Sequence, residues 1–398
     1  EWLPPMLEGP KEERVAIVGA GPAGLGAAFR LARLGYKVSV FEALPVAGGM
    51  MMVGIPEYRL PKAIVNREIE MIKRLGVEIR LNTALGRDFT LEQLRRDGYA
   101  AVLLATGAHQ SATLRIPGED LEGVLGAIHF LREDALGQKP RIGKRVAVIG
   151  GGSVAMDAAR SALRCGAEEV HVFYRRERVD MPAPREEIED AEHEGVRVHV
   201  LTAPTRVLGR EGKVVGLECQ RMELGGYDDS GRRKPVPVKG SEFVVEVDNV
   251  IAAIGQVVHT DFLPDEGGWR TRRGLLAANP RTLATATPGV FAAGDAVSGP
   301  WTLVQALAGG IRAANSIHRY LRGEPLEVVA EGPRRRQWPT PPVGEMVDYG
   351  RTPMPMLPAE ERARRRDEVE LGFTLEMAMR EACRCLRCDI REEEESSS

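Results

Sequence analysis

Two segments of the chain share one pattern of apolar and polar positions. In the first, a β-branched apolar run at Val15–Val18 precedes a glycine-rich turn, an Ala- and Leu-rich segment with helical spacing, and a second apolar run at Val38–Phe41. Short apolar runs bounded by turn residues are typical of buried strands, and apolar residues three to four positions apart are typical of helices. The first segment therefore predicts a strand, a tight turn, a helix and a second strand.

The same order recurs between Arg145 and Arg176. An apolar run at Val146–Ile149 precedes a turn with three consecutive glycines, a helix is predicted to about Cys165, and another apolar run occupies Val170–Phe173. One such unit is weak evidence, because glycine turns also occur for structural reasons alone, whereas two copies are far more specific. The repeat predicts an α/β protein with two Rossmann-like domains.

The remaining pattern adds elements around these two units. Between Thr205 and Val247, short apolar and polar runs alternate and are broken by Gly225-Gly226, which predicts an antiparallel meander. Further helices are predicted at Lys62–Leu75, Leu91–Arg95 and Trp301–Leu321, and another that includes Glu186, Glu187 and Glu189. Further strands are predicted at Val77–Leu81, Ala101–Ala105, Val196–Leu201, Asn249–Ile254 and Val290–Ala293.

The first turn has the composition of a dinucleotide-binding turn. Gly19 allows the turn itself, Gly21 lets the backbone approach a pyrophosphate, and Gly24 lets helix and strand pack closely. The N–H groups and positive dipole end of the following helix then face the phosphates. Glu42 lies 23 positions after Gly19, near the spacing of about 20 for a carboxylate that accepts hydrogen bonds from an adenosine ribose.

The second turn differs in its third glycine and in the residues at the end of its second strand. Ala155 replaces the glycine, a variant that the motif permits. Tyr174, Arg175 and Arg176 stand where the first unit has Glu42. A carboxylate there would repel a 2′-phosphate, whereas guanidinium groups bind one through paired hydrogen bonds. We therefore expect NADP rather than NAD in this unit; the alternative is a solvated arginine pair.

Small residues at strand ends are further candidates for cofactor contacts. Thr106-Gly107 and Gly255 would let a cofactor pack against the backbone. Asp295 follows a strand and can accept hydrogen bonds from a cofactor hydroxyl, and the helix N-terminus near Thr302 can stabilise negative charge on a ring. The alternative is that Asp295 is a loop residue or a helix cap.

Residues 48–61 are rich in Gly and Pro and predict an irregular loop. A long apolar loop in a compact α/β protein is usually functional, so we expect it to lie over a cofactor ring. The alternative is that Met50–Met52 fill a gap in the core.

Composition narrows the functional class. The net charge of -3 gives no reason to expect nucleic acid or an anionic membrane surface as a partner. No apolar run reaches the roughly 18 residues of a membrane span, and no signal peptide is visible, so a cytoplasmic protein is expected. The length of 398 residues allows two or three domains.

The last part of the chain has a different character. Pro and Arg dominate from Glu331 to about Pro358, an amphipathic helix is predicted over Leu375–Ala382, and cysteines follow at Cys383, Cys385 and Cys388. This spacing suits thiolate ligation of an iron-sulfur cluster or Zn, although a complete site normally has four ligands, so a fourth would come from elsewhere. The alternative is ordinary free thiols.

In combination, the two turns, the GGMMMVGIPEYRLPK loop, YRR followed by MPA, and GVFAAGDAV resemble the NADPH-dependent glutamate synthase small-subunit family. That family includes the flavin modules of dihydropyrimidine dehydrogenase and of ferredoxin:NADP transhydrogenases. The resemblance covers roughly Lys11 to Gly323. It implies FAD in the first unit and NADP(H) in the second, with Gly49, Met50 and Thr302 around the flavin. The implied FAD contacts are Gly19, Gly21, Pro22, Ala23, Gly24, Glu42, Ala43, Gly49, Met50, Arg59, Leu60, Thr106, Gly107, Gly294, Asp295 and Thr302; the implied NADP(H) contacts are Gly150, Gly152, Ser153, Val154, Ala155, Arg175, Arg176 and Gly255.

The resemblance also implies the domain order. An FAD-binding domain is expected at residues 1–110 and 257–330, with an NADP-binding domain inserted at 111–256 and a partner-contacting extension at 331–398. Unlike glutamate synthase small subunits, this chain has no cysteine before Val15, so we expect the onward electron route through that family's N-terminal iron-sulfur clusters to be missing from it. The segment RCLRCD at Arg384–Asp389 is similar to the end of members that work with other redox subunits.

These features imply an electron-transfer subunit of a hetero-oligomeric complex. Hydride would pass between NADPH and FAD, and electrons would continue to iron-sulfur centres of a partner subunit. Because this chemistry belongs to the cofactors, no catalytic acid or base is expected among the side chains. Two alternatives stay open: a stand-alone flavin reductase or oxygenase, and a non-catalytic nucleotide-sensing subunit.

Overall fold

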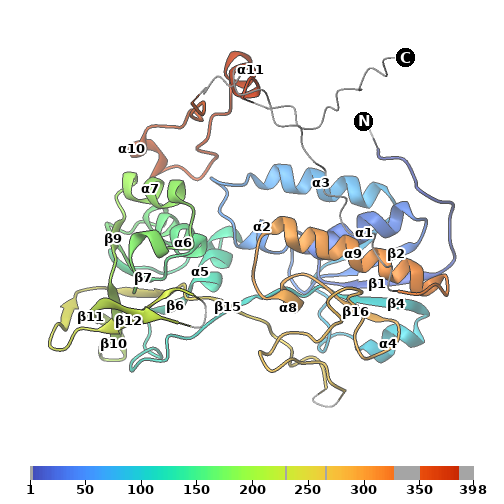
Figure 1. Cartoon of the computed structure of the whole chain (residues 1–398), viewed down its shortest axis with the longest axis horizontal. Helices are drawn as coiled ribbons and strands as arrows, with labels where there is room; N and C mark the ends of the chain where they lie inside the picture. Colours follow the sequence, from blue (N-terminus) through green and yellow to red (C-terminus); the bar gives the residue numbers. More distant parts are fainter. Residues whose placement is uncertain (1–2, 229–230, 265–266, 327–349, 385–398) are drawn as a thin grey trace, which may run out of the picture.

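The computed structural model describes residues 3–228, 231–264, 267–326 and 350–384. They form two lobes, and residues 350–384 of the C-terminal extension lie above the second lobe and the junction of the lobes in Figure 1. None of the helices within these ranges combines the length and the apolar character that crossing a bilayer requires.

The first lobe is built on a five-stranded parallel sheet. Val15 and Ile17 of its central strand pack against helices, whereas Ala16 and Val18 pack on the opposite face, as the two-residue period of a strand requires. In spatial order the strands are β16 (Val290–Ala292), β4 (Tyr99–Leu104), β1 (Arg14–Val18), β2 (Lys37–Phe41) and β3 (Glu78–Arg80).

Helices cover one face of this sheet almost completely. The core on that face joins the sheet to three long helices, and a second core on the other face includes Leu94, Leu263 and Trp269. The helices of this lobe are α1 (Pro22–Arg33), α2 (Met50–Val53), α3 (Lys62–Arg74), α4 (Leu91–Arg96), α8 (Asp295–Ser298) and α9 (Leu303–Leu321).

The second lobe repeats this plan. Its parallel sheet has β7 at the centre with β8 and β9 on one side and β14 on the other, which matches the order of β1, β2, β3 and β4. Its strands are β6 (Val124–Gly126), β14 (Asn249–Ala252), β7 (Arg145–Ile149), β8 (Glu169–Phe173) and β9 (Arg197–His199), and its helices are α5 (Ala127–Ala135), α6 (Ser153–Arg164), a short 3-10 turn (Arg178–Asp180) and α7 (Arg185–His193).

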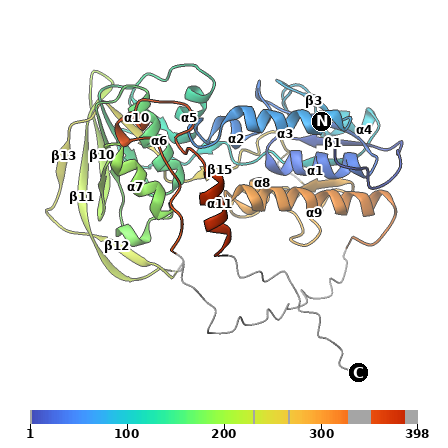
Figure 2. The same ribbon diagram turned by 90° about the horizontal axis from the view of Figure 1, so that it is seen from above.

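An antiparallel sheet covers the outer face of the second lobe, at the left of Figure 2. Ala147, Ile149 and Phe173 of the parallel sheet pack against Val207 and Leu217 of this layer. The predicted antiparallel pairing is confirmed, but the meander order holds only for the first three strands, because the fourth pairs with the second. Its strands are β10 (Thr202–Arg210), β11 (Lys213–Tyr227), β12 (Arg233–Pro237) and β13 (Phe243–Val245).

The second lobe is inserted into the first. The chain leaves the first sheet after β4, builds the whole second lobe, and returns with β16, which pairs with β4 in parallel. At the crossing, β5 (Gln110–Ser111) pairs with β15 (Gln256–Val257) in an antiparallel ribbon. The predicted insertion is therefore confirmed at the level of the fold, while the boundaries at 110/111 and 256/257 stay predictions.

Four of the α-helices are absent from the sequence-based prediction. Residues 48–61 are not wholly irregular, because Met50–Val53 form one helical turn, and Asp295–Ser298 form another. A single turn is too short to show an apolar period. Helix α5 and the short α10 (Ala359–Arg362) were also not predicted. Residues 3–10 have no regular structure and are held by a backbone hydrogen bond from the Leu7 N–H to the Arg33 carbonyl (2.7 Å).

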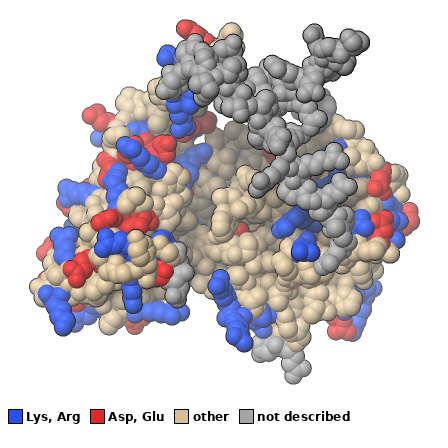
Figure 3. All heavy atoms as spheres, in the orientation of Figure 1, with Lys and Arg blue, Asp and Glu red and all other residues tan. Residues whose placement is uncertain are grey.

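The described part of the C-terminal extension contacts both lobes. Val369 is buried, and its N–H donates to the carbonyl of Tyr58 in the first lobe (3.3 Å). Arg366 forms an ion pair with Asp134 of α5 (2.6 Å). Helix α11 (Leu375–Ala382), predicted with these bounds, buries none of its residues and projects above the junction of the lobes in Figure 1. Figure 3 shows the hollow between the lobes.

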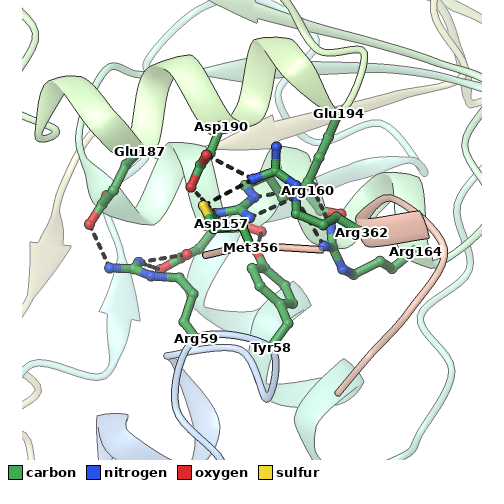
Figure 4. A network of polar contacts seen from close by, with 10 residues as sticks. All are labelled: Tyr58, Arg59, Asp157, Arg160, Arg164, Glu187, Asp190, Glu194, Met356 and Arg362. Carbon is green, nitrogen blue, oxygen red and sulfur yellow. Dashed lines mark hydrogen bonds and ion pairs between the residues drawn. The ribbon is translucent and has the colours of Figure 1, made fainter. Parts of the chain in front are cut away.

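A buried network of charged side chains joins these parts (Figure 4). Arg59 of the first lobe donates to both carboxylate oxygens of Asp157 on α6 (2.7 Å each) and to Glu187 on α7 (2.5 Å). Arg362 of the extension reaches Asp190 on α7 (2.9 Å). The network therefore connects the loop at residues 48–61, the second lobe and the extension.

Glu194 is the most deeply buried acid of this network. Its side chain has no exposed surface and receives hydrogen bonds from Arg160 (2.6 Å) and Arg164 (2.6 Å). Both guanidinium groups also stack over the ring of Tyr58, at 4.7 and 3.8 Å from its centroid. Burial raises the pKa of Glu194, but the two guanidinium groups outweigh it, so the pKa lies below the usual value.

We predict that Glu194→Gln destabilises the protein strongly. The change leaves two buried guanidinium groups without their carboxylate, a loss of about 3–5 kcal/mol for buried pairs, measurable by urea unfolding. Because the pKa of Glu194 is lower in the folded chain, its contribution is complete above the ordinary value of 4.5 and is lost as the pH falls below it. Wild-type and variant stabilities should therefore converge toward acidic pH.

Glu192→Gln is the matched control. Glu192 lies on α7, two residues before Glu194, which is the C-cap of that helix. Its ion pair with Arg178 is partly solvated, so the expected loss is below about 1 kcal/mol. Equal losses for the two variants, or a Glu194→Gln difference that persists at acidic pH, would contradict the prediction.

Candidate functional site

A cavity of about 800 Å³ lies between the two lobes, at the hollow seen in Figure 3. The first lobe contributes the turn after β1, the ends of β2, β4 and β16, and the N-terminus of α9. The second lobe contributes Ser153 and Val154, the first residues of α6. One cavity therefore reaches from the first glycine turn to the N-terminus of α6, the helix that follows the second glycine turn. The predicted residues that line it are Gly19, Gly21, Pro22, Ala23, Glu42, Ala43, Gly49, Met50, Arg59, Thr106, Gly107, Ser153, Val154, Gly294, Asp295 and Thr302.

The first turn has the steric properties of a phosphate cradle. A Cβ on Gly19 would lie 2.3 Å from the carbonyl oxygen of Ala105, and one on Gly24 would lie 1.9 Å from the carbonyl oxygen of Gly19. Around Gly21 the nearest atom would be 3.8 Å away, so its cavity side is open to a ligand. Helix α1 starts at Pro22 without a side-chain cap, which leaves its N-terminal dipole end directed at the cavity.

Glu42 is fixed at the end of β2. Its Oε2 accepts from the N–H of Ala20 (2.8 Å) and its Oε1 from the N–H of Leu44 (2.9 Å). Burial raises the pKa of Glu42, and these backbone bonds oppose the rise. Since each carboxylate oxygen has two acceptor positions, both oxygens keep capacity for hydroxyl groups of a ribose.

The ends of β4 and β16 meet on the same side of the cavity. The Thr106 hydroxyl is buried and has no partner among the described residues, as expected where a ligand completes a site. Burial raises the pKa of Asp295 to about 6, against a lowering by the N–H of Trp301. Thr302 caps α9 by accepting from the N–H of Gln305 (3.4 Å), so the dipole end of α9 faces the cavity.

The loop at residues 48–61, which comes after β2, approaches the first turn closely. A Cβ on Gly49 would lie 2.7 Å from the Cα of Gly21, and Met50 opens α2 beside it. Arg59 lines the cavity, but its guanidinium is engaged by Asp157 and Glu187. Leu60 packs against the first core instead of lining the cavity.

The second turn has a similar shape, but most of its residues do not line the cavity. A Cβ on Gly150 would lie 2.3 Å from the carbonyl oxygen of Ala253, whereas one on Gly152 would meet nothing within 4 Å. Helix α6 begins at Ser153 without a side-chain cap. Like Gly24, the predicted residues Gly150, Gly152, Ala155 and Gly255 are not among those that line the cavity.

The two arginines at the end of β8 differ in their surroundings. Arg175 is exposed, whereas Arg176 is buried. The Arg176 guanidinium donates to Asp228 (2.6 Å) and to the carbonyl of Arg233 (2.9 Å). Of the predicted pair, the side chain accessible to a ligand in this structure is therefore Arg175.

The predicted metal ligands lie mostly outside the described residues. Cys385 and Cys388 fall in 385–398, and Cys383 is exposed at the end of α11. Within the described ranges, no group of three or more His, Cys, Asp or Glu side chains could hold a metal ion. Cys165 and Cys219 are isolated thiols, and burial raises the pKa of each, to about 11 and about 12.

Several cavity residues were not predicted from the sequence. Arg132 and Ile128 come from α5, His109 follows the end of β4, and Phe262 comes from the segment after the second lobe. None of them belongs to a motif whose spacing points to a nucleotide. Only the three-dimensional arrangement brings them to the cavity.

Comparison with known proteins agrees with this geometry. A family model described as pyridine nucleotide-disulphide oxidoreductase matches residues 13–310. The chain is 48% identical over 406 residues to the NADP(+)-dependent formate dehydrogenase subunit beta of Moorella thermoacetica, covering 97% of this chain and 57% of that protein. It is 42% identical over 433 residues to the NADPH-Fe(3+) oxidoreductase subunit beta of Geobacter sulfurreducens, covering 98% and 64%. The chain thus spans less than two thirds of these two relatives.

A shorter relative and a solved structure complete the comparison. The glutamate synthase [NADPH] small chain of Azospirillum brasilense is 38% identical over 352 residues, which cover 83% of this chain and 72% of that protein. The structure of Mycobacterium tuberculosis FprA in complex with NADPH superposes with a TM-score of 0.68 at 21% identity, covering 79% of this chain and 85% of FprA. At this identity the superposition concerns the fold alone. The predicted resemblance is confirmed: the chain belongs to the pyridine nucleotide-disulphide oxidoreductase family and is similar within it to glutamate synthase small chains.

Proposed function

We propose that this protein moves hydride between NADPH and FAD and passes the electrons to a partner subunit of a larger redox assembly. The single observation that carries the proposal is the cavity lined by both lobes, because it includes the first glycine turn and the first residues after the second. Two nucleotide sites that open into one cavity allow two cofactor rings to meet there.

The first lobe offers the features that FAD requires. Gly21 leaves room for a diphosphate, and Glu42 is placed to accept hydrogen bonds from a ribose. Asp295 and the N-terminus of α9 lie at the opposite side of the first turn from Glu42, since β16 and β2 flank the β4–β1 pair. We assign Asp295 to a cofactor hydroxyl and the α9 end to the flavin ring.

The second lobe is assigned to NADPH. The open side of Gly152 and the uncapped start of α6 would receive the diphosphate, and the exposed Arg175 the 2′-phosphate. When both cofactors are bound, the chemistry is transfer of a hydride, two electrons and a proton together, between nicotinamide and flavin. The side chains position the rings, and Arg59 with Asp157 keeps the two lobes in register.

Anaerobic titration with NADPH tests the proposal directly. We expect the purified protein to carry flavin absorbance and to lose it when about one equivalent of NADPH is added, because hydride reaches the flavin. Bleaching that is not followed by electron transfer to any co-purified partner would favour a stand-alone flavin reductase. A flavin that does not bleach would reject both enzymatic functions and leave a nucleotide-sensing role.

Arg175→Gln tests the coenzyme assignment. Loss of a charge-assisted contact to the 2′-phosphate should weaken NADPH binding about 10- to 100-fold and leave NADH binding within about twofold, since NADH has no such group. Arg176→Gln is the comparison variant, because Asp228 already engages that side chain, and it should change coenzyme preference less. Equal losses of NADPH and NADH binding in Arg175→Gln would contradict the assignment.

We further propose that electrons leave through iron-sulfur centres of a partner. Two relatives are named as beta subunits, of a formate dehydrogenase and of an Fe(3+) oxidoreductase, which supports a role within an assembly. Cys383, Cys385 and Cys388 are proposed ligands of an iron-sulfur cluster or Zn shared with that partner.

Metal and acid-labile sulfide analysis of Cys385→Ser, isolated with its partners, tests the cysteine proposal. We expect the content per chain to fall, because a thiolate ligand is lost. Cys165→Ser is the control, since that thiol is remote in sequence and contacts Asp134. An unchanged content in Cys385→Ser would make these cysteines ordinary thiols.

A further inference from the structure

We infer that Arg132 of α5 binds the diphosphate of FAD, so that the second lobe contributes a cationic contact to the cofactor of the first lobe. The inference rests on the proposed binding of FAD at the first turn. It is carried by the position of Arg132, by its unfilled hydrogen-bonding capacity and by the charge balance of the cavity.

Arg132 reaches the cavity from an unexpected direction. Helix α5 belongs to the second lobe, where it packs on α6 and continues directly from strand β6. Ile128 and Arg132, one helical turn apart, both line the cavity that also contains Gly19 and Gly21 of the first turn. The guanidinium therefore lies in the same cavity as the phosphate cradle, although its helix is part of the other lobe.

His109 holds the guanidinium in place. Nη2 of Arg132 donates to Nδ1 of His109 (3.1 Å) and to its carbonyl oxygen (3.1 Å). Burial and the adjacent Arg132 charge lower the pKa of His109 to about 4, so the imidazole is neutral near pH 7 and its Nδ1 can accept. The guanidinium of Arg132 is therefore oriented by two acceptors, the Nδ1 and the carbonyl oxygen of His109, neither of which bears a negative charge.

The remaining donors of Arg132 are not used by the protein. Within the described residues, Nε is buried without a partner, and the hydrogen bonds of this side chain all come from Nη2. A buried N–H without a hydrogen-bond partner is unfavourable because it has lost its water and gained nothing in return, so such a group is expected to have a partner in the working protein. Thr106 presents a second unpartnered buried group in the lining of the same cavity.

Charge balance identifies the kind of partner. Among the cavity arginines, Arg59 is paired with Asp157 and Glu187, and Arg87 is paired with Asp88. Arg132 has no carboxylate within ion-pair distance in the described part of the chain, and the nearby Glu42 acts on its pKa only through space. A fixed cation with free donors matches an anion with several oxygen acceptors, and the diphosphate of FAD is the anion that the first turn is built to hold.

Reconstitution of the apoprotein with FAD tests the inference. We expect Arg132→Gln to weaken FAD binding about 10- to 100-fold, as loss of a charge-assisted hydrogen bond requires, with Arg132→Lys between it and wild type. Affinity is measured by the change of flavin fluorescence on binding, without turnover. Arg96→Gln is the control, because that exposed arginine is paired on its own helix, and it should bind FAD like wild type.

The outcomes separate this inference from the proposed function. If Arg132→Gln binds FAD within twofold of wild type while NADPH still bleaches the flavin, the inference is overturned and the proposed function stands. If the Arg132→Gln apoprotein unfolds at a clearly lower midpoint than the wild-type apoprotein, the loss of FAD affinity reflects a structural role of Arg132. The inference is then again overturned. If wild-type protein binds no FAD, the proposed function fails first.

Discussion

The ion pair between Arg59 and Asp157 is the contact on which the geometry of the site depends. Arg59 belongs to the loop at residues 48–61, which packs against the first glycine turn, and Asp157 lies on the helix that begins at the second. One buried contact therefore relates the positions of both turns. A buried ion pair adds little net stability, because desolvation offsets the attraction between the charges. Its contribution here is geometric: it specifies how the lobes face each other.

The rest of the network extends this constraint to a third part of the chain. Glu194 aligns Arg160 and Arg164 under the ring of Tyr58, while Arg362 binds Asp190 from the other side. The extension is thus packed onto the same α6 and α7 surface that holds Arg59. Its described residues belong to the scaffold of the two lobes, and only α11 leaves that scaffold to lie exposed.

Features encoded by neighbouring residues could be predicted from the sequence, and features that depend on distant contacts could not. The two glycine turns, the strand ends and Glu42 follow from short motifs. The structure brings the first turn, Glu42 and the ends of β4 and β16 to one cavity, and the second turn meets this cavity only through the first residues of α6. The pairing of Arg176 with Asp228 joins residues 52 positions apart, so Arg175 and Arg176 could not be told apart from their neighbours in the sequence. Arg132 lies in a short helix without a motif, and its place beside His109 follows only from how the lobes pack.

The antiparallel ribbon of β5 and β15 has a consequence for how this architecture can change. Because Gln110 pairs with Val257 and Ser111 with Gln256, the entry and exit of the inserted lobe leave the first lobe side by side. Termini that lie together allow a domain to be inserted or exchanged without rerouting the host chain. The inserted second lobe is therefore a module, and its size and sequence can diverge while the strand order of the first lobe stays the same.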